Sequence, residues 1–134
     1  GDITFRSSPT QIGALTAWLN IDNSNISGLS VKTDGTLWSW GYNGQGQLGL
    51  GNTTNRSSPN QVGSLTNWSK IAAQNNSFAS IKTDGTLWTW GINYGGVLGL
   101  GNTTYYSSPK QVGSLTTWLS IAGGNYNILA IATT

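Results

Sequence analysis

The chain has 134 residues, of which only 7% are charged, a net charge of +2, and no cysteine, histidine or methionine. This composition excludes disulfide bonds, thiolate catalysis and histidine-based metal sites. The lysine and arginine residues are scattered and form no basic run, which argues against binding to nucleic acid or to a lipid surface. No apolar run approaches the roughly 20 residues of a membrane span, so we expect no membrane insertion.

The sequence repeats itself with a period of fifty residues. Residues 82–93 echo residues 32–43, and Ser57–Pro59 recurs as Ser107–Pro109 and as Ser7–Pro9. A period of 40 to 50 residues with strand-like segments is typical of a propeller blade. The chain therefore reads as a single repeat array, with units of approximately 1–50, 51–100 and an incomplete 101–134.

Four strands can be placed in one unit, in chain order. The pattern predicts strands over 69–73, 78–83, 86–91 and 107–112, with a long glycine-rich loop over 92–106. Asp84-Gly85 predicts a type I′ hairpin turn between the second and third strands. Pro109 cannot donate a ladder hydrogen bond, so the fourth strand is predicted at the outer edge of its sheet.

The tryptophans predict sheets that are apolar on both faces. Trp88 and Trp90 are two residues apart and share one face of the third strand, whereas Leu87 points to the other. We interpret the seven tryptophans as packing between blades. A ligand-stacking platform is the alternative, and it would require the rings to be exposed to solvent.

Several motifs recur in phase and resemble the regulator-of-chromosome-condensation repeat family. They are Leu87–Asn93, Gly96–Gly101, Pro109 with Val112, and Ile121–Gly124. The resemblance covers essentially the whole chain, and it implies a propeller, usually of seven blades, each of four antiparallel strands.

The chain also departs from the family pattern. Family repeats commonly carry a histidine where this chain has Ser27, Ser77 and Asn127. The polar loops that exchange factors of the family use cannot be placed on this sequence. Kelch repeats have a similar period, but Gly95-Gly96 and Gly123-Gly124 lie at different phases here, which disfavours that family.

The sequence thus predicts an all-β fold of β-propeller blades, about 2.7 per chain. Because terminal repeats without polar caps expose apolar faces, we expect other copies or missing repeats to complete the array. Missing N-terminal repeats, a ring of several copies, and a head-to-tail filament all remain open. The last residues lack the counterparts of Lys82 and Asp84, which favours a natural C-terminus.

No catalytic constellation is visible, so we expect no enzyme, no cofactor and no metal. The only acids are Asp2, Asp22, Asp34 and Asp84, and the last two read as turn residues. The glycine-rich loop 44–51 lacks the Lys-Ser/Thr ending of a phosphate-binding loop.

The main functional hypothesis is a non-enzymatic structural or interaction module that self-associates. Its low charge and Asn/Thr/Ser/Gly bias suggest a virion-surface or extracellular adhesion or assembly component. Such a component would bind other copies of itself, or a protein or glycan receptor. One alternative is a regulatory propeller of the guanine-nucleotide-exchange type, and another is an engineered propeller fragment.

Partner-binding residues are predicted where the copies disagree in otherwise matching loops. Aromatic and arginine side chains on a rigid scaffold are favoured contact residues. The candidates are Tyr42, Arg56, Tyr94, Tyr105, Tyr106 and Tyr126. The alternative is that these positions drift freely in solvated loops.

Overall fold

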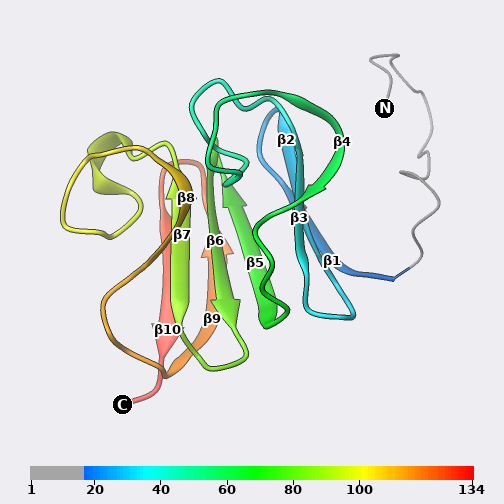
Figure 1. Cartoon of the computed structure of the whole chain (residues 1–134). Helices are drawn as coiled ribbons and strands as arrows, with labels where there is room; N and C mark the ends of the chain where they lie inside the picture. The colour runs from blue at the N-terminus through cyan, green and yellow to red at the C-terminus, as the bar shows by residue number, and fades with distance from the viewer. Residues whose placement is uncertain (1–16) are drawn as a thin grey trace.

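The structure is a computed structural model that describes residues 17–134, and the described chain is all-β apart from one turn of 3-10 helix (Figure 1). The elements are β1 (Trp18–Asn23), β2 (Ser27–Lys32), β3 (Leu37–Gly41), β4 (Arg56–Gln61), β5 (Trp68–Gln74), β6 (Ser77–Lys82), β7 (Leu87–Gly91), η1 (Tyr94–Gly96), β8 (Tyr106–Gln111), β9 (Trp118–Gly123) and β10 (Ile128–Ala132). All four strands predicted within one unit are confirmed to within a residue or two.

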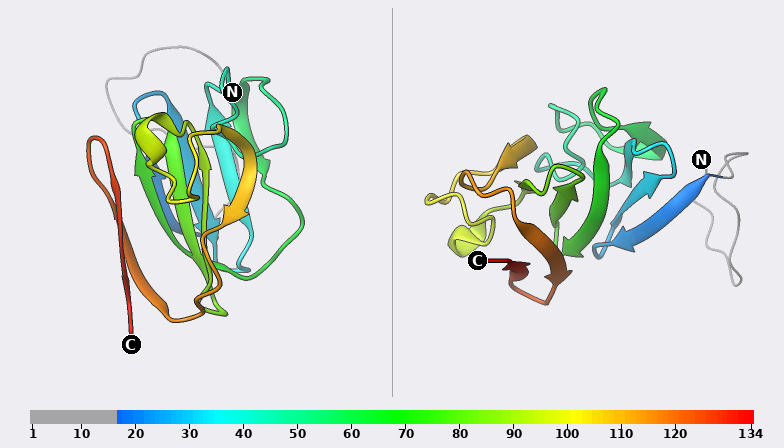
Figure 2. Two further views of the ribbon diagram at one scale, coloured as in Figure 1. Left: turned by 90° about the vertical axis from the view of Figure 1, so that its left-hand side faces the viewer. Right: turned by 90° about the horizontal axis from the view of Figure 1, so that it is seen from below.

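The strands form three antiparallel sheets that lie side by side like blades of a fan (Figure 2). Blade 1 has the order β1-β2-β3-β4, blade 2 the order β5-β6-β7-β8, and blade 3 consists of β9 and β10. Strand β5 contacts β1 on one side and β9 on the other. The expected blades of four antiparallel strands are confirmed, with Pro109 on the edge strand β8 as predicted.

The Asp-Gly turn between β6 and β7 is a correction to the prediction. Gly85 has a φ of 77°, but Asp84 does not have positive φ, and Gly85 N donates to Lys82 O at 3.0 Å. The connection is therefore a type I turn followed by a left-handed glycine, not a type I′ turn. Asp84 Oδ1 accepts hydrogen bonds from the Thr86 hydroxyl at 2.6 Å and the Thr86 N–H at 3.0 Å, which lower the pKa of Asp84.

The tip of this hairpin is hydrogen-bonded to the start of the next blade and to the loop that enters its own blade. Trp118 N donates to Gly85 O at 3.1 Å, and Thr83 N donates to Asn67 O at 2.8 Å. A Cβ atom on Gly85 would lie 2.1 Å from Thr116 O, so no larger residue fits at this position. Glycine is thus required for blade-to-blade contact as well as for the turn.

The core lies between the blades rather than inside a single sheet. The cluster between blades 1 and 2 and the smaller cluster between blades 2 and 3 are formed by different faces of blade 2. Trp88 and Trp90 face blade 1 and Leu87 faces blade 3, as predicted. Trp90 is fully buried, with ring centroids 6.0 Å from Phe78 and 6.3 Å from Trp68. Its role in packing between blades is confirmed.

Replacement of the central tryptophan tests this arrangement. Trp90→Ala should lower the free energy of unfolding by about 3–5 kcal/mol, because it empties the junction of blades 1 and 2. Trp40→Ala is the matched control, since Trp40 occupies the same repeat position but is only half-buried, on the outer face of blade 1. Urea unfolding should show a clearly smaller loss for the control. Equal losses would contradict a core placed between the blades.

Candidate functional site

All six sequence-predicted partner residues lie at one end of the blades. Successive strands run in opposite directions, so the β1–β2, β3–β4, β5–β6, β7–β8 and β9–β10 connections meet at the same end, which we call the loop rim (Figure 1). The six residues are Tyr42 and Arg56 in or beside the β3–β4 loop, Tyr94, Tyr105 and Tyr106 in or beside the β7–β8 loop, and Tyr126 in the β9–β10 turn.

The tyrosines among these residues differ in how far their side chains are exposed to solvent. Tyr94 and Tyr126 are 84% and 83% exposed, and Tyr42 and Tyr105 are also exposed. Tyr106 packs against the core cluster between blades 1 and 2, and its hydroxyl accepts a hydrogen bond from Asn102 at 3.2 Å. Tyr106 therefore contributes to the packing between blades, whereas the rings of the four exposed tyrosines are accessible to a partner at the loop rim.

Buried asparagines hold the long rim loops in place. Asn93 Oδ1 accepts from Leu98 N at 2.9 Å, and Asn93 Nδ2 donates to Asn102 O at 2.9 Å. Asn43 makes the same two bonds in blade 1 and a third to Thr54 O at 3.1 Å. The sequence analysis identified the recurrent motif Leu87–Asn93 but missed this role of its last residue, although a leucine follows each asparagine at the same spacing.

A polar cavity of about 340 Å³ lies at the loop rim where the inner turns of the three blades meet. Asn25 Nδ2 donates to Asn75 Oδ1 at 3.0 Å, and Gln74 Nε2 donates to Asn125 O at 3.0 Å. Tyr126 also borders the cavity. One hydrogen bond therefore joins the inner turns of blades 1 and 2, and another joins those of blades 2 and 3.

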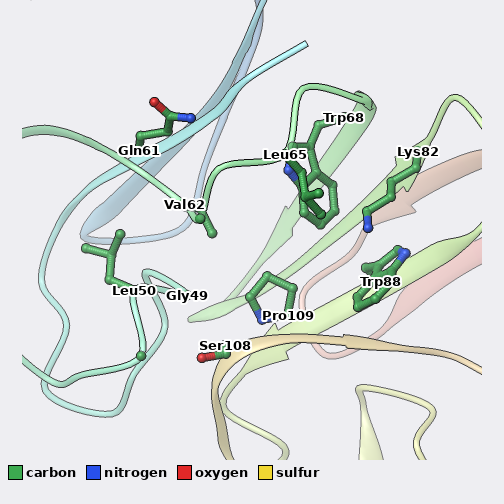
Figure 3. Close-up of a pocket in the computed structure, with 12 residues that line it drawn as sticks. Gly49, Leu50, Gln61, Val62, Leu65, Trp68, Lys82, Trp88, Ser108 and Pro109 are labelled. Carbon is green, nitrogen blue, oxygen red and sulfur yellow. The ribbon is translucent and has the colours of Figure 1, made fainter.

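A second cavity, of about 310 Å³, opens between blades 1 and 2 (Figure 3). Two indoles, Trp68 and Trp88, form one side, and the ammonium of Lys82 lies 4.6 Å and 3.7 Å from their ring centroids. Sequence reasoning treated the lysines as scattered and missed this site. The signal was that Lys32 and Lys82 recur in phase, each near the recurrent tryptophans.

The described residues offer few groups for acid–base or metal chemistry. Within residues 17–134, no three His, Cys, Asp or Glu side chains are grouped to hold a metal ion. Asp34 and Asp84 hydrogen-bond within their turns, and Asp22 Oδ2 accepts from Ala73 N at 2.8 Å between blades. Asp2 lies outside the described residues. In the same part of the chain, no helix is long and apolar enough to cross a membrane.

The sequence model of the regulator of chromosome condensation (RCC1) repeat matches residues 34–78 and 84–131, well over half of the chain. The chain belongs to the RCC1 repeat family. The resemblance inferred from the repeat motifs is thereby confirmed. No curated protein matches the sequence closely enough to be compared.

Solved RCC1-type structures share the fold. The human protein WBSCR16 has a TM-score of 0.80 and 21% identity, over 93% of this chain and 33% of that chain. Prp20p from Saccharomyces cerevisiae, described with its binding properties to Gsp1p and histones, has a TM-score of 0.77 and 14% identity, over 92% and 33%. Yeast RCC1 (Prp20) bound to Kap60 has a TM-score of 0.79 and 21% identity, over 95% and 30%.

The chain therefore spans about a third of the length of these structures. At this level of identity the likeness shows the fold, and the RCC1 propeller supports a regulatory or interaction module. The comparisons lend no support to a virion-surface or adhesive role.

Replacement of Asn93, which holds the β7–β8 loop by hydrogen bonds, tests how this loop is organised. Asn93→Ala should lower the free energy of unfolding by about 2 kcal/mol, because it leaves the buried Leu98 N–H and Asn102 carbonyl without their partner. The exposed Asn125→Ala should change it by less than about 0.5 kcal/mol. Hydrogen exchange should also accelerate across residues 94–105 in the first variant alone. Unchanged exchange there would show that the asparagine does not organise the loop.

Proposed function

We propose that this RCC1-type array is a non-enzymatic protein-interaction module. Its two flanks join further propeller blades, in a second copy of the chain or in further repeats, and its loop rim contacts a protein partner. The observation that carries the proposal is that each flank presents the side chains that the chain already uses at its internal blade junctions.

The outer face of blade 3 is exposed to solvent and carries apolar residues at the repeat positions that are buried between blades 2 and 3. Leu129 and Ile131 are 59% and 64% exposed. They occupy the repeat positions of Ala79 and Ile81, which are buried beneath blade 3. An apolar face of this kind in water favours association, because burying it removes apolar surface from solvent.

The outer face of blade 1 is the complementary half. Ile21 is exposed, and its counterparts Ile71 and Ile121 both pack against the blade that precedes them. Trp38 and Trp40 lie on the same face as half-buried rings, in the positions of Trp88 and Trp90. One flank can therefore pack on the other in a head-to-tail contact, in which β9 and β10 provide the part of the junction that the first two strands of a blade supply.

Sedimentation velocity tests the self-association. The chain should show a weight-average mass that rises above 14.1 kDa with concentration in the micromolar range. The double variant Leu129→Lys with Ile131→Lys should remain monomeric, because two ammonium groups would be buried in the contact. Leu115→Lys is the matched control, since Leu115 is similarly exposed but lies in a loop outside the sheet face, and it should associate like the parent chain. A parent chain that stays monomeric throughout would refute this part of the proposal.

A second candidate function is regulation of the guanine-nucleotide-exchange type. The observation in its favour is the likeness to Prp20p, whose structure is described together with binding to Gsp1p and histones. The exposed tyrosines of the loop rim are the side chains available for such a contact.

Two measurements address this second candidate. A pull-down with purified Gsp1p tests binding, and release of a fluorescent guanine nucleotide from small GTPases tests exchange. Binding should weaken about tenfold in Tyr94→Ala with Tyr126→Ala, and should be kept in Leu115→Lys. Absence of both binding and accelerated release would remove this candidate and leave the flank-mediated association standing. The extracellular or virion-surface location stays a prediction.

A further inference from the structure

The cavity between blades 1 and 2 is bordered by Lys82, whose ammonium forms no salt bridge with a described residue. Lys82 is only 6% exposed, and no hydrogen bond or salt bridge of its Nζ is found among the described residues. Its charged end lies against two indoles at the edge of the cavity, 4.6 Å from the ring centroid of Trp68 and 3.7 Å from that of Trp88. The two cation–π contacts compensate only part of the lost hydration.

The walls of the cavity are apolar on several sides. Trp68, Trp88, Leu65, Val62 and Pro109 border it, and no aspartate or glutamate does. Figure 3 shows the Lys82 side chain running between the two indoles, with its nitrogen toward the space that Pro109 also borders. The opening thus combines one positive charge with a hydrophobic enclosure large enough for a small organic group.

One further polar group of a residue that borders the cavity lacks a hydrogen-bond partner. The indole Nε1 of Trp68 is buried and has no hydrogen-bond partner, whereas that of Trp88 donates to Thr86 at 2.8 Å. Burial lowers the pKa of Lys82, and the charge of Asp84 opposes that shift. An anion beside the ammonium would supply the hydrogen-bond acceptor that the folded chain leaves out.

We propose that this cavity binds a carboxylate carried on an apolar body, with Lys82 as the anion-binding group and Trp68 and Trp88 as the walls that hold the apolar part. The carboxylate chemistry is common to a free small acid and to the end of an acidic peptide. This inference is independent of the proposed self-association, because the cavity lies between two complete blades within one chain.

The repeat provides its own comparison within the chain. Lys32 stacks on Trp38 at 4.1 Å in blade 1, so the same lysine–indole pair recurs there. At the third copy the position is Ala132, which removes the ammonium from the equivalent place. The proposed site is therefore specific to the junction of blades 1 and 2 among the described junctions.

Titration with phenylacetate tests the site, and phenylacetamide is the uncharged probe of the same shape. The indole N–H resonances of Trp68 and Trp88, assigned with single Trp→Phe variants, should shift and saturate with a Kd of about 1 mM, as befits a fragment-sized ligand. Phenylacetamide should bind about tenfold more weakly, because it lacks the charge. Equal affinity for the two probes, or no shift at these resonances, would overturn the proposal.

Two variants place the binding at Lys82. Lys82→Met keeps the hydrocarbon stem and should weaken phenylacetate about tenfold while leaving phenylacetamide unchanged. Lys32→Met removes the equivalent ammonium from blade 1 and should leave the shifts at Trp68 and Trp88 intact. Circular dichroism checks that the Lys82→Met chain is folded. If the folded variant binds phenylacetate as tightly as the parent chain does, the assignment of Lys82 is contradicted. A short peptide with a C-terminal Phe, compared with its amide, distinguishes a peptide end from a free acid.

Discussion

Blade 2 depends on neighbouring blades that cover both of its faces. All six residues of the second strand of each complete blade, β2 and β6, are buried, and the two faces of β6 belong to different core clusters. A twisted sheet with two apolar faces cannot leave either in water without a large loss of hydrophobic stabilisation. The neighbouring blade is thus part of the core of each blade, and the array is stable in proportion to the junctions it completes.

This constraint separates the surfaces that serve assembly from those free for recognition. The sheet faces at the two flanks are apolar because their residues occupy the same repeat positions as residues buried at the internal junctions. These faces are therefore suited to packing against another blade. Three exposed tyrosines of the loop rim, Tyr42, Tyr94 and Tyr105, lie on loops that the buried Asn43 and Asn93 anchor by hydrogen bonds, which lowers the entropic cost of ordering these loops on a partner. The cavity beside Lys82 arises at a junction for another reason, since the recurrent lysine and tryptophans of one blade meet loop residues of the blade before it.

The sequence predicted the blades well because its information is local and repeated. Alternation around Trp88 and Trp90, the proline of the edge strand and the period of fifty each specify one feature of a four-stranded sheet. The turn type predicted at Asp84 was wrong, because the hairpin closes with Lys82 N donating to Thr86 O and so has a three-residue loop, which takes a type I turn followed by a left-handed residue. The Lys82 cavity was missed because its walls come from residues brought together only when two blades pack, and no single repeat contains them.

Hydrogen exchange at two protein concentrations tests the central claim, that a blade is held by its neighbours. At low concentration, amides of β10 should exchange much faster than those of β6, which has blades on both sides. At high concentration, β10 should gain protection as its outer face is covered, while β6 should change little. Protection of β10 equal to that of β6 at the lowest concentration would show that blade 3 is stable with one face open, and would contradict the account.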